Sequence, residues 1–213
     1  MGNTAVTLFH GSKEGLDGPI RPVSRPQCDF GSGFYMGTDR LQPLTLVCNA
    51  PSPHLYELEL ELHGLTVLQF DANIDWALFI AYNRGKLEEY RGTELYRHYE
   101  QLGSEADVIV GKIANDRMFV VLDRFFSGTI TDSALIACLA SLNIGSQYVA
   151  KTDRACRQIS IEKDRALTPI QCEEYDILSQ KNRSEGIAAA DRICRAHRRE
   201  GRYFDEILED WRA

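Results

Sequence analysis

The stretch Leu8-Phe9-His10-Gly11-Ser12 predicts an apolar strand that ends on a histidine followed directly by glycine and serine. Further along the chain, Phe30-Gly31-Ser32-Gly33-Phe34-Tyr35-Met36 predicts a glycine-rich turn that leads into an aromatic pair. Together the two stretches offer a fixed imidazole, an uncovered backbone beside it and an aromatic face. These are the parts needed by a site that holds a ribose, a flat amide-bearing ring and a pyrophosphate.

The bulk composition indicates one domain with an appendage. The chain has 213 residues, of which 44% are hydrophobic, so it can bury a substantial core. Its formal net charge of -7 argues against broad affinity for a nucleic acid backbone. No stretch approaches the roughly 20 apolar residues of a membrane span, and the start of the chain does not resemble a signal peptide. We expect a cytoplasmic protein, or an effector secreted without a cleaved signal peptide, and no membrane partner.

The cysteines indicate neither a metal site nor a disulfide scaffold. None of the six forms a C-x-x-C pair, and no cluster of histidine and cysteine has the spacing of a zinc site. Scattered thiols of this kind fit a reducing cytosol, in which most of them serve as small apolar residues. We therefore expect no bound metal.

The hydrophobic patterns predict an α+β fold. The clearest strand is 54–63, where Tyr56, Leu58, Leu60 and Leu62 alternate with glutamates that face solvent. The other expected strands are 5–10, 66–70, 107–114, 147–150 and 156–161. The expected helices are 41–48, 74–83, a segment from Asn115 or Asp116 to 126, and 131–142.

The chain changes character after Thr168-Pro169. Residues 183–202 hold six arginines against three acids, which is typical of a solvated helix face. Tyr203, Phe204, Ile207, Leu208 and Trp211 then form an amphipathic stripe, which either covers its own core or binds a partner. We divide the chain into a domain of residues 1–168 and a C-terminal helical extension of residues 169–213.

His10-Gly11-Ser12 with Gly31-x-Gly33-Phe34-Tyr35 resembles the NAD-binding motif of the histidine–tyrosine class of ADP-ribosyltransferases. That class includes diphtheria toxin and the poly(ADP-ribose) polymerases. The wider pattern resembles a bacterial family of ADP-ribosyltransferase-like proteins, through residues 75–84, 107–116 and 147–149 in the same order. The resemblance spans most of residues 5–162.

The resemblance implies a split mixed β-sheet with flanking helices around a nucleotide cleft, with the C-terminal helices as an appendage. It also implies NAD as a co-substrate that loses nicotinamide through an oxocarbenium-like transition state. In this interpretation His10 bonds the adenosine-side ribose, the Gly11 backbone holds the nicotinamide carboxamide, and Tyr35 stacks on the nicotinamide ring. The rest of the implied NAD-binding set is Ser12, Gly31, Gly33 and Phe34.

The third element of the motif departs from the family pattern. The polymerase-like enzymes place a glutamate at the start of a late strand, and the matching position here is Gln147. Glutamine can bond a ribose hydroxyl but cannot act as a general base. Either another carboxylate takes that role, with Asp116 and Asp107 as candidates, or the acceptor needs little activation.

Each of these residues also has a structural alternative. His10 could satisfy a loop carbonyl, the glycines could only shape a turn, and Gln147 could be an ordinary strand residue. Asp116 is most simply an acid in the first turn of a helix. Arg84, just before Gly85, is either a solvated cation at a helix end or a clamp on the NAD pyrophosphate or the acceptor.

The leading hypothesis is a mono-ADP-ribosyltransferase that modifies a macromolecule, as a bacterial toxin or effector. The acceptor would be a protein, including a host regulator such as ubiquitin, or a nucleic acid base, and the net acidity favours protein. Bacterial relatives of this kind occur in toxin–antitoxin pairs, so a cognate antitoxin is a candidate partner. The alternatives are an NAD glycohydrolase, a non-catalytic module that binds NAD or ADP-ribose, and a partner-binding protein that uses the stripe from 203 to 211.

Overall fold

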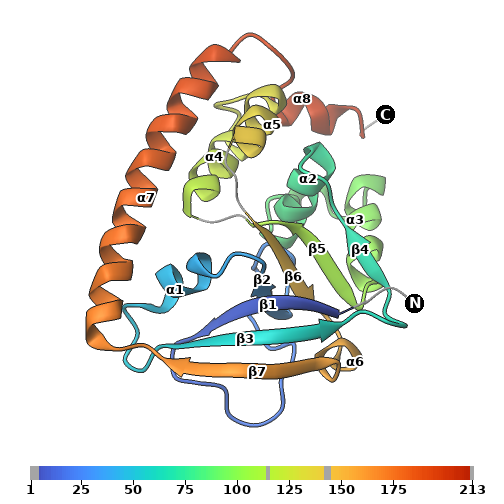
Figure 1. The fold of residues 1–213 in the computed structure, drawn as a ribbon. Helices are drawn as coiled ribbons and strands as arrows, with labels where there is room; N and C mark the ends of the chain where they lie inside the picture. Colours follow the sequence, from blue (N-terminus) through green and yellow to red (C-terminus); the bar gives the residue numbers. More distant parts are fainter. Residues whose placement is uncertain (1–4, 114–115, 142–144, 212–213) are drawn as a thin grey trace.

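The computed structural model describes residues 5–113, 116–141 and 145–211, without the side chains of 116–119. Within these ranges it has a mixed seven-stranded sheet flanked by helices, as the α+β prediction requires (Figure 1). The strand order is β4-β5-β6-β2-β1-β3-β7, and only β4 and β5 run parallel. The strands are β1 (Ala5–Ser12), β2 (Phe34–Gly37), β3 (His54–Glu61), β4 (Val67–Gln69), β5 (Val108–Lys112), β6 (Ser146–Ala150) and β7 (Ile159–Ala166).

The sheet has one weak seam, between β1 and β2. Along β1 every residue from Ala5 to Ser12 pairs with β3, but only Phe9 pairs with a residue of β2, Gly37. The seam therefore separates β4-β5-β6-β2 from β1-β3-β7, and little main-chain bonding holds the two groups together.

The helices lie around this sheet. Figure 1 shows α2 and α3 beside β5 and β4, and the long α7 running from the end of β7 to the region of α4 and α5. The larger core gathers Trp76 and Phe79 of α2, Tyr99 of α3 and Phe125 of α4. The described helices are α1 (Leu41–Val47), α2 (Ile74–Asn83), α3 (Glu94–Ser104), α4 (Asp116–Phe126), α5 (Asp132–Ser141), α6 (Asp153–Cys156), α7 (Pro169–Ala196) and α8 (Phe204–Glu209), with a 3₁₀ turn η1 (Glu88–Tyr90).

A second core lies under β1 and β3. Leu8 of β1 and Leu58 of β3 are fully buried there, together with Phe34 and Met36 of β2. The alternation along 54–63 was therefore interpreted correctly, although β3 ends at Glu61. Because neighbouring residues of a strand face opposite sides, burial of Phe34 directs Tyr35 away from this core.

The predicted helix 74–83 is confirmed residue for residue. Asn73 begins it, and its side-chain oxygen accepts a hydrogen bond of 3.1 Å from the Trp76 N–H. Other elements were missed or misplaced. The predicted strand 156–161 was wrong at its start, because Cys156 ends helix α6, and β7 continues through charged residues to Ala166. No prediction covered α3.

The C-terminal helices pack into the body of the molecule. Helix α7 begins at Pro169, after a capping box on Thr168. Ala190 and the stripe residues Phe204, Ile207 and Leu208 belong to the larger core. This part of the stripe covers the protein's own interior, whereas Tyr203 and Trp211 are exposed. The division into residues 1–168 and 169–213 stays a prediction.

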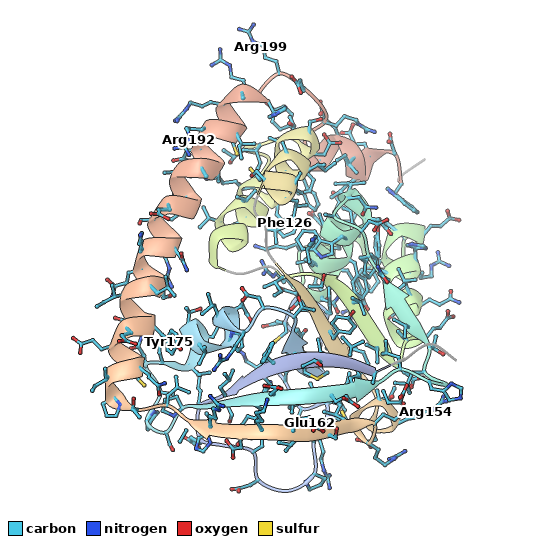
Figure 2. All side chains as sticks on the ribbon, viewed as in Figure 1. Phe126, Arg154, Glu162, Tyr175, Arg192 and Arg199 are labelled. Carbon is cyan, nitrogen blue, oxygen red and sulfur yellow. The ribbon has the colours of Figure 1, made fainter. Side chains whose placement is uncertain are left out.

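The arginines at the end of α7 and just after it face solvent, as expected. Figure 2 shows Arg192 and Arg199 pointing away from the body of the molecule, and both are exposed. None of the helices in the described ranges is long and apolar enough to cross a lipid bilayer.

The packing of α8 predicts a large stability loss in Phe204→Ala. Phe204 is 4% exposed, and its ring lies 5.3 Å from Phe125 and 5.4 Å from Phe126 between centroids. Truncation of a buried phenylalanine costs about 3–5 kcal/mol. Denaturant unfolding should show that loss, whereas Ile177→Ala on the exposed face of α7 should change stability by no more than about 0.5 kcal/mol. Similarly small stability losses in Phe204→Ala and Ile177→Ala would contradict the packing of α8 against the larger core.

Candidate functional site

A cavity of about 340 Å³ opens at the seam between β1 and β2. It brings together residues that lie far apart in the sequence: His10 and Gly11 of β1, Tyr35 of β2, Gln147 of β6, and Arg84 at the end of α2. The sequence predicted all five as site residues. The remaining lining residues are Phe9, Arg25, Gln27, Cys28, Asp29, Met36, Gly37, Gln42, Pro43, Leu46 and Ile113.

His10 bridges the seam with its side chain. Its Nδ1 lies 2.7 Å from the Tyr35 carbonyl oxygen, and a carbonyl can only accept, so Nδ1 carries the proton. Burial lowers the pKa of His10, and the hydrogen bond to Tyr35 offsets part of that effect. The imidazole is therefore neutral near pH 7, and its Nε2 is an acceptor that suits a hydroxyl group. The Phe34 ring stacks on it at 4.4 Å between centroids.

The Tyr35 side chain is fixed through its hydroxyl group, whereas its backbone carbonyl binds His10. The hydroxyl donates to the Gly31 carbonyl at 2.7 Å and accepts from the Phe30 N–H at 3.0 Å. Burial raises the pKa of Tyr35 far above its usual range, so the hydroxyl stays protonated. Tyr35 thus offers a fixed aromatic face and is unsuited to proton transfer.

The two glycines of the turn have structural reasons to be glycine. Gly31 has a φ of +71°, which side-chain-bearing residues rarely adopt. A Cβ on Gly33 would lie 3.0 Å from the Ala150 carbonyl oxygen and closer still to Val149. Neither glycine lines the main cavity, although Gly33 lines a second hollow described below.

Arg84 is not the solvated helix-end cation that one interpretation expected. Its side chain is 8% exposed, and its Nε and Nη2 donate to Asp29 Oδ1 at 2.9 and 2.5 Å. Asp29 was not predicted as a site residue. Its only signal in the sequence is its place just before Phe30-Gly31, which is also where an ordinary turn acid would stand.

Gln147 lies in the cavity, as the second residue of β6. It is 8% exposed, and its Nε2 donates to the Lys112 carbonyl at 3.3 Å. Its side chain also lies close enough to Asp29 to act on the pKa of that carboxyl group. Burial raises the pKa of Asp29, while Arg84 and Gln147 oppose that rise.

A second hollow, of about 420 Å³, lies on the far side of His10 and Tyr35. These two residues line both spaces, so the hollows meet at them. The loop that forms its outer wall is fixed at Leu16, whose N–H donates to the Tyr56 hydroxyl at 2.9 Å. Its other lining residues are Asp17, Gly18, Pro19, Ile20, Arg21, Val23, Ser24, Gly33 and Phe34.

Phe34 lines only the second hollow, and three further predicted residues contribute no described side chain to either hollow. The Ser12 hydroxyl donates to the Gly15 carbonyl at 2.6 Å. Asp107 accepts hydrogen bonds from the Thr66 N–H and the Thr152 hydroxyl, at 3.0 and 2.7 Å, and these bonds lower its pKa. Asp116 begins α4, and its side chain lies outside the described residues.

Lys151 is a further residue that the sequence did not single out. It follows β6, and its Nζ donates to the Phe30 carbonyl. Burial lowers its pKa to about 8. Lys151 and the Tyr35 hydroxyl thus hold the backbone of the same residue, Phe30, from two directions.

The fold and site define an α+β protein whose mixed sheet opens at one seam, with a cavity at the opening that polar and apolar residues line together. Residues 6–161 match the model of the family described as "Protein of unknown function (DUF3990)", and the chain belongs to that family. No curated protein matches the chain. Among solved structures, a chain of the M. tuberculosis MbcT–MbcA toxin–antitoxin complex is 9% identical, with a TM-score of 0.43. The match covers 81% of this chain and 90% of that one.

The protonation of His10 predicts how stability depends on pH. Its pKa in the folded protein lies below the ordinary 6.5, so the unfolded chain binds this proton more readily. The stability that the neutral His10 contributes is fully present above pH 6.5. It is lost as the pH falls through the lowered pKa of His10 in the folded protein. The unfolding free energy should therefore fall more steeply below about pH 6.5 in the wild type than in His10→Asn. Parallel pH curves from chemical denaturation would contradict the buried neutral imidazole.

Proposed function

We propose that this protein is a mono-ADP-ribosyltransferase that takes ADP-ribose from NAD and transfers it to a macromolecule, as a toxin or effector. The observation that carries the proposal is the meeting of His10, Tyr35 and Gln147 around one cavity at the seam. The sequence motifs assigned these three residues to one NAD site although they lie on three different strands. Packing alone does not require a histidine, a tyrosine and a glutamine to converge there.

The two hollows suggest how NAD would lie. His10 stands between them, and its acceptor nitrogen suits a hydroxyl of the adenosine-side ribose. The nicotinamide half would occupy the main cavity, with its ring on Tyr35 and its carboxamide on the Gly11 backbone. The adenosine half would enter the second hollow, where Ile20, Val23 and Phe34 offer apolar contacts.

The reaction would begin with cleavage of the bond between C1′ and the nicotinamide nitrogen. The electron pair of that bond goes to the nicotinamide ring, and positive charge develops on the ribose. Tyr35 and Gly11 fix the leaving group, while Gln147 bonds a hydroxyl of the ribose, so the reacting atoms are held in place. The acceptor then bonds to C1′ and loses a proton.

Gln147 favours one second candidate, a protein that binds NAD or ADP-ribose without breaking it. A glutamine at this position supplies hydrogen bonds but no negative charge. Tight nucleotide binding without release of nicotinamide would support this candidate over the transferase.

The decisive experiment incubates the full chain with labelled NAD, with and without cell lysate, and measures free nicotinamide and labelled macromolecules. We expect label that survives nuclease and disappears with protease. His10→Ala and Tyr35→Ala should each lower the rate by about 100-fold or more, because each removes a group that orients NAD. His63→Ala, which changes an exposed histidine, and Tyr175→Ala on α7 serve as controls and should leave the rate unchanged.

The pattern of products separates the candidates. Nicotinamide release with free ADP-ribose and no labelled macromolecule would indicate an NAD glycohydrolase. Labelling that is unchanged in both His10→Ala and Tyr35→Ala would overturn the proposed site. Absence of nicotinamide release under every condition would overturn the transferase.

A further inference from the structure

Asp29 is the one carboxylate among the described residues that line the main cavity. Its side chain is 15% exposed, so it is largely shielded from bulk water while still bordering the cavity. It comes from the loop before β2, whereas Gln147 comes from β6. The cavity therefore contains a carboxylate after all, next to the residue at which the family pattern would place a glutamate.

The position of Asp29 is fixed from several elements. Arg84 from the end of α2 donates twice to Oδ1, and Gln147 from β6 lies close enough to lower the pKa of the carboxyl group. The next residue, Phe30, is held through its N–H by Tyr35 and through its carbonyl by Lys151. A side chain held at both its carboxylate and its adjacent backbone is oriented before any substrate arrives.

Fold stability alone is a poor explanation for this arrangement. A buried ion pair contributes little net stability, because removing two charges from water offsets most of their attraction, and an apolar pair of similar size often serves as well. Burial also makes this carboxyl group more basic than a solvated aspartate, even with Arg84 beside it. A carboxylate that is shielded, oriented and made more basic has the properties of a general base.

We infer that Asp29 is the group that activates the acceptor, in the role that Gln147 cannot fill. This inference rests on the proposed function. As the acceptor oxygen or nitrogen bonds to C1′, its proton passes to the Asp29 carboxylate, and the electron pair of the broken bond stays on nicotinamide. Arg84 and Gln147 hold the carboxylate in place and do not take the proton.

The test measures nicotinamide release from NAD by the full chain, in buffer and in lysate, with and without sodium azide. Asp29→Asn should release nicotinamide about 100-fold more slowly than the wild type, because without its base the acceptor does not capture C1′, and nicotinamide still held in the cavity re-forms its bond to the ribose. Azide carries no proton when it attacks C1′, so it should restore release in Asp29→Asn and form the ADP-ribosyl azide. Asp29→Glu should retain part of the activity without azide.

Asp71→Asn is the matched control, because Asp71 is exposed and does not line the cavity. Thermal melting and NAD binding of Asp29→Asn establish that the variant is folded and can bind its substrate. An unchanged rate in Asp29→Asn would overturn the inference. So would a slow rate that azide fails to raise although the variant is folded and binds NAD, since this would indicate a purely structural role. If the wild type itself releases no nicotinamide under any condition, the proposed function fails, and this inference fails with it.

Discussion

The hydrogen bond from His10 Nδ1 to the Tyr35 carbonyl is the interaction on which the site depends. Strands β1 and β2 share only the pair Phe9 and Gly37, so the backbone ladder gives this seam little support. The imidazole supplies a connection that the main chain does not make. The same bond fixes the tautomer of His10 and sets the carbonyl of Tyr35 beside it. One interaction thereby closes the seam, orients an acceptor nitrogen and positions the strand that carries the aromatic face.

Burying the charged side chains of Asp29 and Arg84 in the wall of the cavity lowers the stability of the fold. The apolar packing around them offsets this loss. Placing Asp29 and Arg84 where they are 15% and 8% exposed removes two charges from water, and losing one partner of such a pair costs about 3–5 kcal/mol. The larger core, which includes Phe30 next to Asp29, supplies apolar burial against that cost. The buried pair is therefore stable only while both Asp29 and Arg84 are present, and this favours one orientation of the Asp29 carboxylate.

The sequence predicted the parts of the molecule in which local pattern and tertiary packing agree. Helix α2 has an asparagine cap and a glycine just past its end, and both bounds were correct. Helix α3 was missed because only Leu95, Tyr96 and Tyr99 are buried in an otherwise polar segment. The far end of β7 was missed because Lys163 and Arg165 pair with β3 at an exposed edge, where no alternation of apolar residues is required.

The same contrast separates the site residues that were predicted from those that were not. His10, Tyr35 and Gln147 were found because each stands in a motif whose neighbours restrict its place on a strand. Asp29 and Lys151 have no such local signal, since their partners Arg84 and Phe30 lie 55 and 121 positions away in the chain. Their importance exists only after folding brings α2, β6 and the loop before β2 together. A motif can therefore locate the groups that would contact NAD, whereas groups whose partners lie far away in the chain become visible only in three dimensions.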